Sequence, residues 1–295
     1  MQQPSAADIR KEQRKQARGI HGGRLKMLIA WLGVTLSRLP IPSRSLRGKL
    51  FRSVFGQKYD SLNEEEAEFP IEDYPTLNAV FTRGLKPECR PIPETDSQYL
   101  VPCDCRVQET GLIDGETILT AKQIDYTLSS LCPEMDISRY QNGRYAILFL
   151  SPADCHRVFS PQAGRVEEAM HVPGSRLLVH PPFQRKEFPT FTLNERMVFR
   201  IETPLGSCLV IMVAGWGVGD ITLPWDPEFR CSSRTIIRKQ YDEPTQLDRC
   251  GWLATFNLGS TAIVITEPNE KSEVLVADDE KLQYGQPLFD FPPSY

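Results

Sequence analysis

The sequence is poor in the residues that build metal clusters and disulfide scaffolds. It has eight cysteines and four histidines among 295 residues. A disulfide-stabilised secreted domain needs a far higher cysteine density, and no Cys-x-x-Cys pair is present to begin a zinc knuckle. We therefore expect free thiols, a reducing compartment and no bound metal. Four of the cysteines are expected to be small apolar residues of the core, namely Cys89, Cys132, Cys208 and Cys231.

The sequence also lacks a hydrophobic run long enough to cross a bilayer. The uncharged stretch at residues 27–37 is shorter than the roughly 20 residues that a spanning helix needs, and Pro40 and Pro42 follow it. Because this stretch begins only after a long polar segment, we do not expect a signal peptide. With 40% hydrophobic and 24% charged residues, the composition is that of a globular protein, which excludes a disordered, collagen-like or polytopic membrane protein.

Positive charge is concentrated at the N-terminal end of an otherwise acidic chain. Residues 1–58 hold thirteen Lys or Arg and two acidic residues, a net charge of +11, whereas the remainder carries −15. The same segment has apolar residues at helical spacing: Leu25, Leu28, Ile29, Leu32, Leu36 and Leu39. This combination is typical of a helix lying among anionic lipid headgroups, and a helix packed in an N-terminal cap is the alternative. Nucleic acid is not an expected partner, because no basic–aromatic interleaving accompanies the charge.

The pattern along the chain divides it into three regions. Residues 1–22 form a basic arm that we expect to be mobile, and residues 23–98 form a helical, membrane-associating region. Residues 99–295 contain short runs rich in Val, Ile and Phe separated by Gly and Pro, for example at 146–150, 197–201, 208–214 and 261–265. Strands and helices do not alternate as a parallel sheet requires. The predicted fold class is therefore α+β, a mostly antiparallel β body with an N-terminal helical region.

Four polar stretches interrupt the β pattern and could carry chemistry. They lie at residues 102–105, 151–157, 194–196 and 258–261 and include Asp104, His156 and Ser260. A Gly-Ser-Thr sequence before a strand is most often only a turn, and an isolated histidine is more often structural than catalytic. From the residue types alone, the most specific function that can be suggested is that of a hydrolase using Ser, His and Asp.

The order of these stretches along the chain resembles the phosphatidylserine decarboxylase family. The matching blocks are N-A-V-F-T-R-G-L-K-P at 78–87 with R-P-I at 90–92, A-K at 121–122 with Y-T-L at 126–128, L-S-P-A-D-C-H-R-V at 150–158, V-P-G at 172–174, N-E-R at 194–196, V-A-G-W-G-V-G at 213–219 and L-G-S-T at 258–261. Each block is only moderately specific. Their common order over about three quarters of the chain makes a chance resemblance very improbable.

The resemblance implies a precursor that cuts itself between Gly259 and Ser260 and converts Ser260 into a covalent pyruvoyl cofactor. That group would decarboxylate phosphatidylserine to phosphatidylethanolamine in phospholipid biosynthesis. In the family a Ser/His/Asp relay activates the serine, and Ser260 and Asp104 match its serine and aspartate. His156 matches a histidine that the family uses near the substrate and in the protonation that follows decarboxylation.

Three departures fall on the processing site. The relay histidine is replaced by Phe159, the glycine after the relay aspartate is Cys105, and the family's K-G-x-E-x-G box reads R-C-G-W-L-A at 249–254. A general base typically contributes about 10²–10⁴ in rate, so cleavage would be slowed unless His156, His171 or His180 takes over. A non-cleaving relative that only binds lipid is therefore the alternative, and a Ser260 hydrolase is a further one.

The expected partners follow from the charge and from the resemblance together. They are the substrate phosphatidylserine and an anionic phospholipid membrane, with the protein held peripherally on its cytoplasmic face. A homodimer is compatible with the sequence.

Overall fold

The computed structural model describes residues 15, 23–56, 62–120, 124–180, 184, 188–215, 220–229, 231, 234–257 and 260–292. The mobile arm predicted over residues 1–22 lies outside these ranges apart from Lys15. All eight cysteines are free, as expected. Cys132 and Cys208 are buried, but Cys89 and Cys231 are partly exposed, so the prediction that all four lie in the core is wrong for these two.

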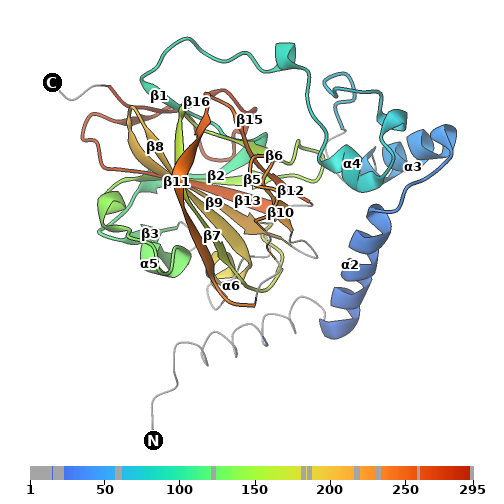
Figure 1. Ribbon diagram of the computed structural model, residues 1–295, viewed down its shortest axis with the longest axis horizontal. Helices are drawn as coiled ribbons and strands as arrows, with labels where there is room; N and C mark the ends of the chain where they lie inside the picture. The colour runs from blue at the N-terminus through green and yellow to red at the C-terminus, as the bar shows by residue number, and fades with distance from the viewer. Residues whose placement is uncertain are drawn as a thin grey trace, which may run out of the picture.

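An eight-stranded antiparallel sheet forms the centre of the molecule (Figure 1). Its strands lie in the spatial order β11 (Ile237–Leu247), β7 (Gly164–Val172), β8 (Arg196–Thr203), β9 (Gly206–Ala214), β13 (Ser260–Thr266), β5 (Arg144–Leu150), β2 (Cys105–Leu112) and β15 (Lys281–Leu282). Every neighbouring pair is antiparallel. The prediction of a mostly antiparallel β body is confirmed.

Both faces of this sheet are buried. Along β13, Ala262 and Val264 belong to one hydrophobic core, whereas Ile263 and Ile265 belong to the other. Successive side chains of a strand point to opposite faces, and here both faces are covered, so the central strands are continuous apolar runs. This is why the runs at 146–150, 208–214 and 261–265 could be recognised as strands.

Smaller elements cover the two faces. One face packs against two three-stranded sheets, β10 (Ile221–Thr222), β12 (Trp252–Phe256) and β6 (Arg157–Phe159), and β1 (Gln98–Leu100), β16 (Pro287–Asp290) and β14 (Glu273–Val274). The other face packs against the hairpin of β3 (Thr117–Leu119) and β4 (Asp125–Thr127) and the short helices α5 (Leu128–Leu131) and α6 (Thr190–Leu193). A 3-10 helix, η3 (Ser138–Tyr140), leads into β5.

The N-terminal helices form a separate layer with a small core of its own. They are α2 (Gly23–Ser37), α3 (Arg44–Gly56), α4 (Leu77–Phe81) and the 3-10 helices η1 (Ile71–Asp73) and η2 (Pro87–Cys89). Phe51, Phe55, Ile71, Val80 and Phe81 pack together in this core. Helices therefore occupy the region where the sequence predicted them, interrupted at Pro40 and Pro42.

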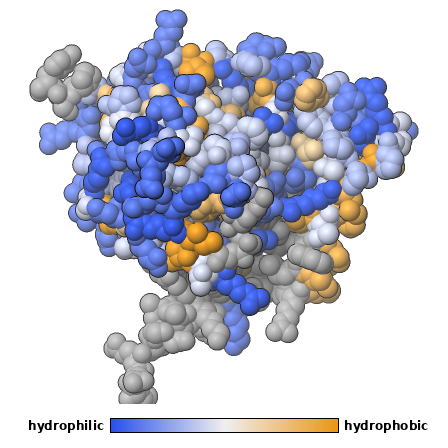
Figure 2. Space-filling model, in the orientation of Figure 1, coloured by the Kyte–Doolittle hydropathy of each residue, from blue (hydrophilic) through white to orange (hydrophobic). Residues whose placement is uncertain are grey.

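Helix α2 stands away from the β body and exposes its apolar side chains. Leu25, Leu28, Ile29, Leu32 and Leu36 are between 44% and 68% exposed. Hydrophobic side chains accordingly gather on the surface over α2 (Figure 2). Among the described residues, no helix is both long enough and apolar enough to cross a bilayer.

Candidate active site

The sheet brings three of the four polar stretches to one end of the central strands. Ser260 is the first residue of β13, and it is paired with Leu150 at the end of β5 and with Ala214 at the end of β9. The Ala214 amide donates to the Glu195 carbonyl at 2.9 Å. The segment 151–157, which follows β5, and residues 194–196 therefore lie beside the start of β13.

Close backbone packing at this end explains the glycine of the V-P-G block. A Cβ atom at Gly174 would lie 2.2 Å from the carbonyl carbon of Asn194, a distance that no side chain tolerates. The Asn194 side chain also links the neighbouring segments, because its Nδ2 donates to the carbonyls of Leu177 and Ala214 at 2.9 and 2.7 Å. Asn194 thus has a structural role that its position in the sequence did not reveal.

Ser260 is described only through its backbone, and Gly259 lies outside the described residues. The extended conformation of Ser260 is fixed on both sides by β5 and β9. The linkage predicted to break thus joins directly to a strand that is paired on both sides.

Asp104 lies just before β2 and is held by an arginine. It is 8% exposed. Its Oδ1 accepts hydrogen bonds from Arg90 Nε and the Tyr284 amide, both at 3.0 Å, and its Oδ2 accepts one from Arg90 Nη2 at 2.5 Å. Arg90 Nη2 also contacts Glu66 Oε2 at 2.8 Å. Burial opposes the charged form of Arg90, but hydrogen bonds to Asp104 and Glu66 outweigh it and raise the Arg90 pKa.

Phe159 lies close to this carboxylate, where the resemblance expects the relay imidazole. Its amide donates to the Pro102 carbonyl at 2.8 Å, and its ring stacks on Tyr284 with centroids 4.0 Å apart. Tyr284 is the residue whose amide binds Asp104. The fold therefore keeps the two relay positions in one neighbourhood, but Arg90 and the Tyr284 amide bind Asp104 in place of an imidazole.

His156 is fully buried beneath α4. Its ring packs on Phe81 with centroids 3.8 Å apart, and its Nδ1 lies 2.9 Å from the Asp154 carbonyl oxygen. Because a carbonyl can only accept, Nδ1 carries the proton and Nε2 presents a lone pair. Within the described part of the chain, Nε2 has no hydrogen-bond partner. Burial lowers the pKa of His156 to about 3, so the ring is neutral near pH 7.

A small charged pocket of about 100 Å³ lies beside these residues. Asp104, Asp154 and Glu66 line it together with Arg83, Arg90 and Lys281, whereas His156 does not reach it. Burial raises the pKa of Asp154 to about 6, although its carboxylate accepts a hydrogen bond from the Ser151 amide at 2.7 Å. The pocket thus presents both signs of charge at the position of the predicted relay aspartate.

Two arginines of this site were not identified from the sequence. Arg90 neutralises Asp104, and Arg83 donates from Nη2 to the Ala153 carbonyl at 2.9 Å, which holds the loop that precedes His156. Both lie in the blocks at 78–87 and 90–92. Nothing in a single sequence marks an arginine as buried, because this residue is usually exposed.

His156 and Asp154 are expected to act oppositely on stability in acid. Unfolded His156 takes up a proton near its ordinary pKa of 6.5 but folded His156 only near 3, so acid favours unfolding in this window. Folded Asp154 is protonated from about pH 6, unfolded Asp154 only near 3.8, so protonation there favours folding. A His156→Gln variant should gain roughly 1.4 kcal/mol in unfolding free energy, relative to wild type, per pH unit of acidification from 6.5.

Urea unfolding between pH 7.5 and 4.5 measures this slope. An Asp154→Asn variant is the matched control and should shift the slope in the opposite direction. Identical pH slopes for wild type and His156→Gln would show that the imidazole is not held neutral by the fold.

Comparison with known proteins places this site in a family of decarboxylases. The family model described as phosphatidylserine decarboxylase matches residues 77–290, from the start of α4 to the end of β16. Helices α2 and α3 precede the matched region. The chain belongs to the phosphatidylserine decarboxylase family.

Curated relatives are similar over most of their length. The phosphatidylserine decarboxylase proenzyme of Halorhodospira halophila is 35% identical over 82% of this chain and 85% of the relative. The proteins of the same name from Anaeromyxobacter sp. and Xanthomonas campestris are 31% and 36% identical, over 86% and 73% of this chain and 90% and 78% of the relatives. The resemblance inferred from the sequence blocks is confirmed.

Proposed function

We propose that this chain is a self-cleaving precursor whose mature form decarboxylates phosphatidylserine to phosphatidylethanolamine. The observation that supports this most is the position of Ser260. It begins a central strand at the point where the ends of β5 and β9 and the segment around Glu195 meet. Membership of a family whose relatives are named as proenzymes agrees with a cut at this position.

The cleavage chemistry requires only groups of the chain itself and one water molecule. The Ser260 hydroxyl would attack the Gly259 carbonyl and convert the amide into an ester. Loss of the Ser260 α-proton would then expel the Gly259 carboxylate and leave dehydroalanine, which water converts to a pyruvoyl group with release of ammonia. The products are residues 1–259 and a chain of 36 residues, 260–295.

The residues near Ser260 fit such a group. A pyruvoyl group supplies an electron sink for the electrons of the breaking C–C bond. His156 belongs to the segment that follows β5, and its buried Nε2 has no partner among the described residues, as a group that exchanges a proton would need. A proton taken up at this nitrogen would be donated readily, since burial disfavours the charged ring. The Phe81 ring packs on the imidazole, and His156 is fully buried, so bulk water does not contact it.

Intact mass spectrometry, with and without a carbonyl-trapping hydrazine, tests the proposal. Two chains, with the smaller one blocked at its N-terminus and gaining the mass of the hydrazine less one water, are the expected result. A single chain that reacts with a serine-directed fluorophosphonate would instead identify a hydrolase. A single chain that ignores both reagents but binds vesicles would identify a lipid-binding protein without catalysis.

We further propose that α2 holds the protein peripherally on the cytoplasmic face of an anionic membrane. The support is its exposed apolar face in a segment of net charge +11. Part of that charge is already paired, because Arg44 contacts Asp73, and Arg52 contacts Glu64 and Glu72. The apolar side chains of α2 should therefore add to the binding supplied by the other basic residues of the segment.

Replacing Leu28, Leu32 and Leu36 together with Ser is expected to weaken vesicle binding more than about 100-fold, because each loses the stabilisation of a buried leucine, about 1.5–3 kcal/mol when burial is complete. Co-sedimentation with phosphatidylserine-containing vesicles measures the loss. A variant with Leu112→Ser and Leu275→Ser, two exposed leucines of the β body, should bind like wild type. Equal binding by the α2 variant would exclude α2 as the anchor.

A further inference from the structure

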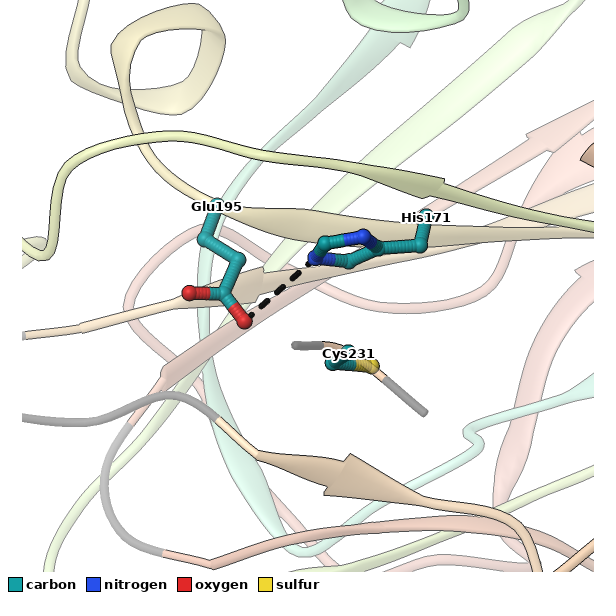
Figure 3. A group of neighbouring side chains, drawn as sticks. All are labelled: His171, Glu195 and Cys231. Atoms are coloured by element: carbon teal, nitrogen blue, oxygen red, sulfur yellow. Dashed lines mark ion pairs between the residues drawn. The ribbon is translucent and has the colours of Figure 1, made fainter. Parts of the chain in front are cut away.

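Three side chains with metal-binding atoms meet in the β body, at the end of the sheet where β13 begins. His171 belongs to β7, Glu195 immediately precedes β8, and Cys231 follows β10 (Figure 3). One ligand atom from each lies within 4.8 Å of the other two. The side chains of His171 and Glu195 are 1% and 7% exposed.

The polar atoms of this cluster are poorly satisfied. Neither nitrogen of His171 nor Oε1 of Glu195 has a hydrogen-bond partner among the described residues. His171 Nε2 and Glu195 Oε1 are 3.5 Å apart, which is long for an N–H···O hydrogen bond. Buried polar groups left in this state are costly, so an unseen ligand is the natural explanation.

The spacing fits ligands that share one cation. Two N or O ligands at about 2.0–2.1 Å from a tetrahedral zinc ion are separated by about 3.3 Å, close to the Nε2–Oε1 distance. The Cys231 sulfur, within 4.8 Å of the other two ligand atoms, would have to move to about 2.3 Å from the same ion. An imidazole, a carboxylate and a thiolate together favour zinc and similar transition ions over magnesium or calcium, which prefer oxygen ligands alone.

We propose that His171, Glu195 and Cys231 bind one zinc-like divalent cation, with water completing a tetrahedral site. The second oxygen of Glu195 supports this arrangement. Oε2 accepts a hydrogen bond from Arg176 Nε at 3.0 Å, which orients the carboxylate and leaves Oε1 directed at His171. An ion pair alone does not account for the cluster, because it leaves Nδ1 of His171 buried without a partner among the described residues. The Cys231 thiol donates to the Ile221 carbonyl at 3.2 Å, and cation binding would replace this hydrogen bond with a bond from the thiolate.

The position of the site suggests what the cation stabilises. It links β7, the start of β8 and the segment after β10, and the Glu195 carbonyl binds the amide of Ala214, the partner of Ser260. Metal would therefore fix the end of the sheet where the chain is proposed to be cut. Binding itself does not depend on cleavage, so the two proposals can fail separately.

Metal content and a cobalt spectrum test the site. Protein purified without chelators should contain about one equivalent of zinc, and the apoprotein reloaded with Co²⁺ should show a thiolate-to-cobalt charge-transfer band. Cys231→Ser should abolish this band, and His171→Gln and Glu195→Gln should each weaken Co²⁺ binding at least tenfold. The uncleavable Ser260→Ala precursor should bind like wild type.

Matched controls come from the same chain. Cys89→Ser and His180→Gln change a partly exposed cysteine and an exposed histidine outside the cluster and should leave the band and the affinity unchanged. Wild-type protein with neither zinc nor a charge-transfer band would overturn the proposal, whether or not any variant folds. A band that survives in folded Cys231→Ser would overturn it as well.

Discussion

A Ser260→Ala precursor should remain one uncut chain of about 33.5 kDa without detectable decarboxylase activity. Alanine has no hydroxyl to attack the Gly259 carbonyl, and it cannot become a pyruvoyl group by elimination. Both the cut and the electron sink are therefore lost in one substitution, which makes this the largest effect that we expect. Intact mass and release of CO₂ from phosphatidylserine measure the two losses.

Ser97→Ala is the matched control for this experiment. The Ser97 hydroxyl bonds Asp290 at 3.2 Å, between β1 and β16, and has no part in the proposed chemistry. This variant should be cut and active like wild type. Activity in an uncut Ser260→Ala chain would refute the pyruvoyl mechanism.

Phe159→His should accelerate the appearance of the 36-residue chain by about 10²–10⁴, the usual contribution of a general base. The reason is positional, because the Phe159 ring lies on Tyr284, whose amide binds Asp104. An imidazole here would be next to the carboxylate that the relay requires. A time course of intact mass after rapid synthesis measures the rate.

Phe159→Leu distinguishes the effect of adding an imidazole from the effect of losing the aromatic stacking on Tyr284. It removes the contact with Tyr284 without adding a base, so cleavage should not become faster. If Phe159→His is also no faster than wild type, then Arg90 has taken Asp104 out of any relay, and another group activates Ser260. Arg90 has the geometry for this, with two of its nitrogens on the Asp104 carboxylate.

Much of the β body could be predicted because its signal is local. The runs at 146–150, 197–201, 208–214 and 261–265 are apolar at nearly every position, and all four lie in strands of the central sheet. Such runs arise where both faces of a sheet are covered. These runs do not predict that the polar stretches meet at one end of the sheet, because a single segment does not specify which strand it pairs with. Only the family resemblance grouped those stretches into one site.

Two features of the site depend on long-range contacts and could not be predicted. Arg90 reaches Asp104 from a loop outside the sheet, and its pairing depends on burial that one sequence does not reveal. The cluster of His171, Glu195 and Cys231 is formed by three separate segments of the chain. A search of the sequence for metal ligands that are close together along the chain therefore does not find it. In both cases the side chains are brought together by the fold and not by their spacing along the sequence.

The placement of β13 has a consequence for the mature protein. After the proposed cut, the 36-residue fragment would contribute β13 between β9 and β5, β15 beside β2, and the pair of β16 and β14 beside β1. Its release would dismantle three parts of the sheet system at once, so the fragments should stay together under native conditions. Once separated by denaturant, however, they must find each other by diffusion. Refolding of the mature form therefore becomes bimolecular and improves with concentration, whereas the precursor refolds as a single molecule.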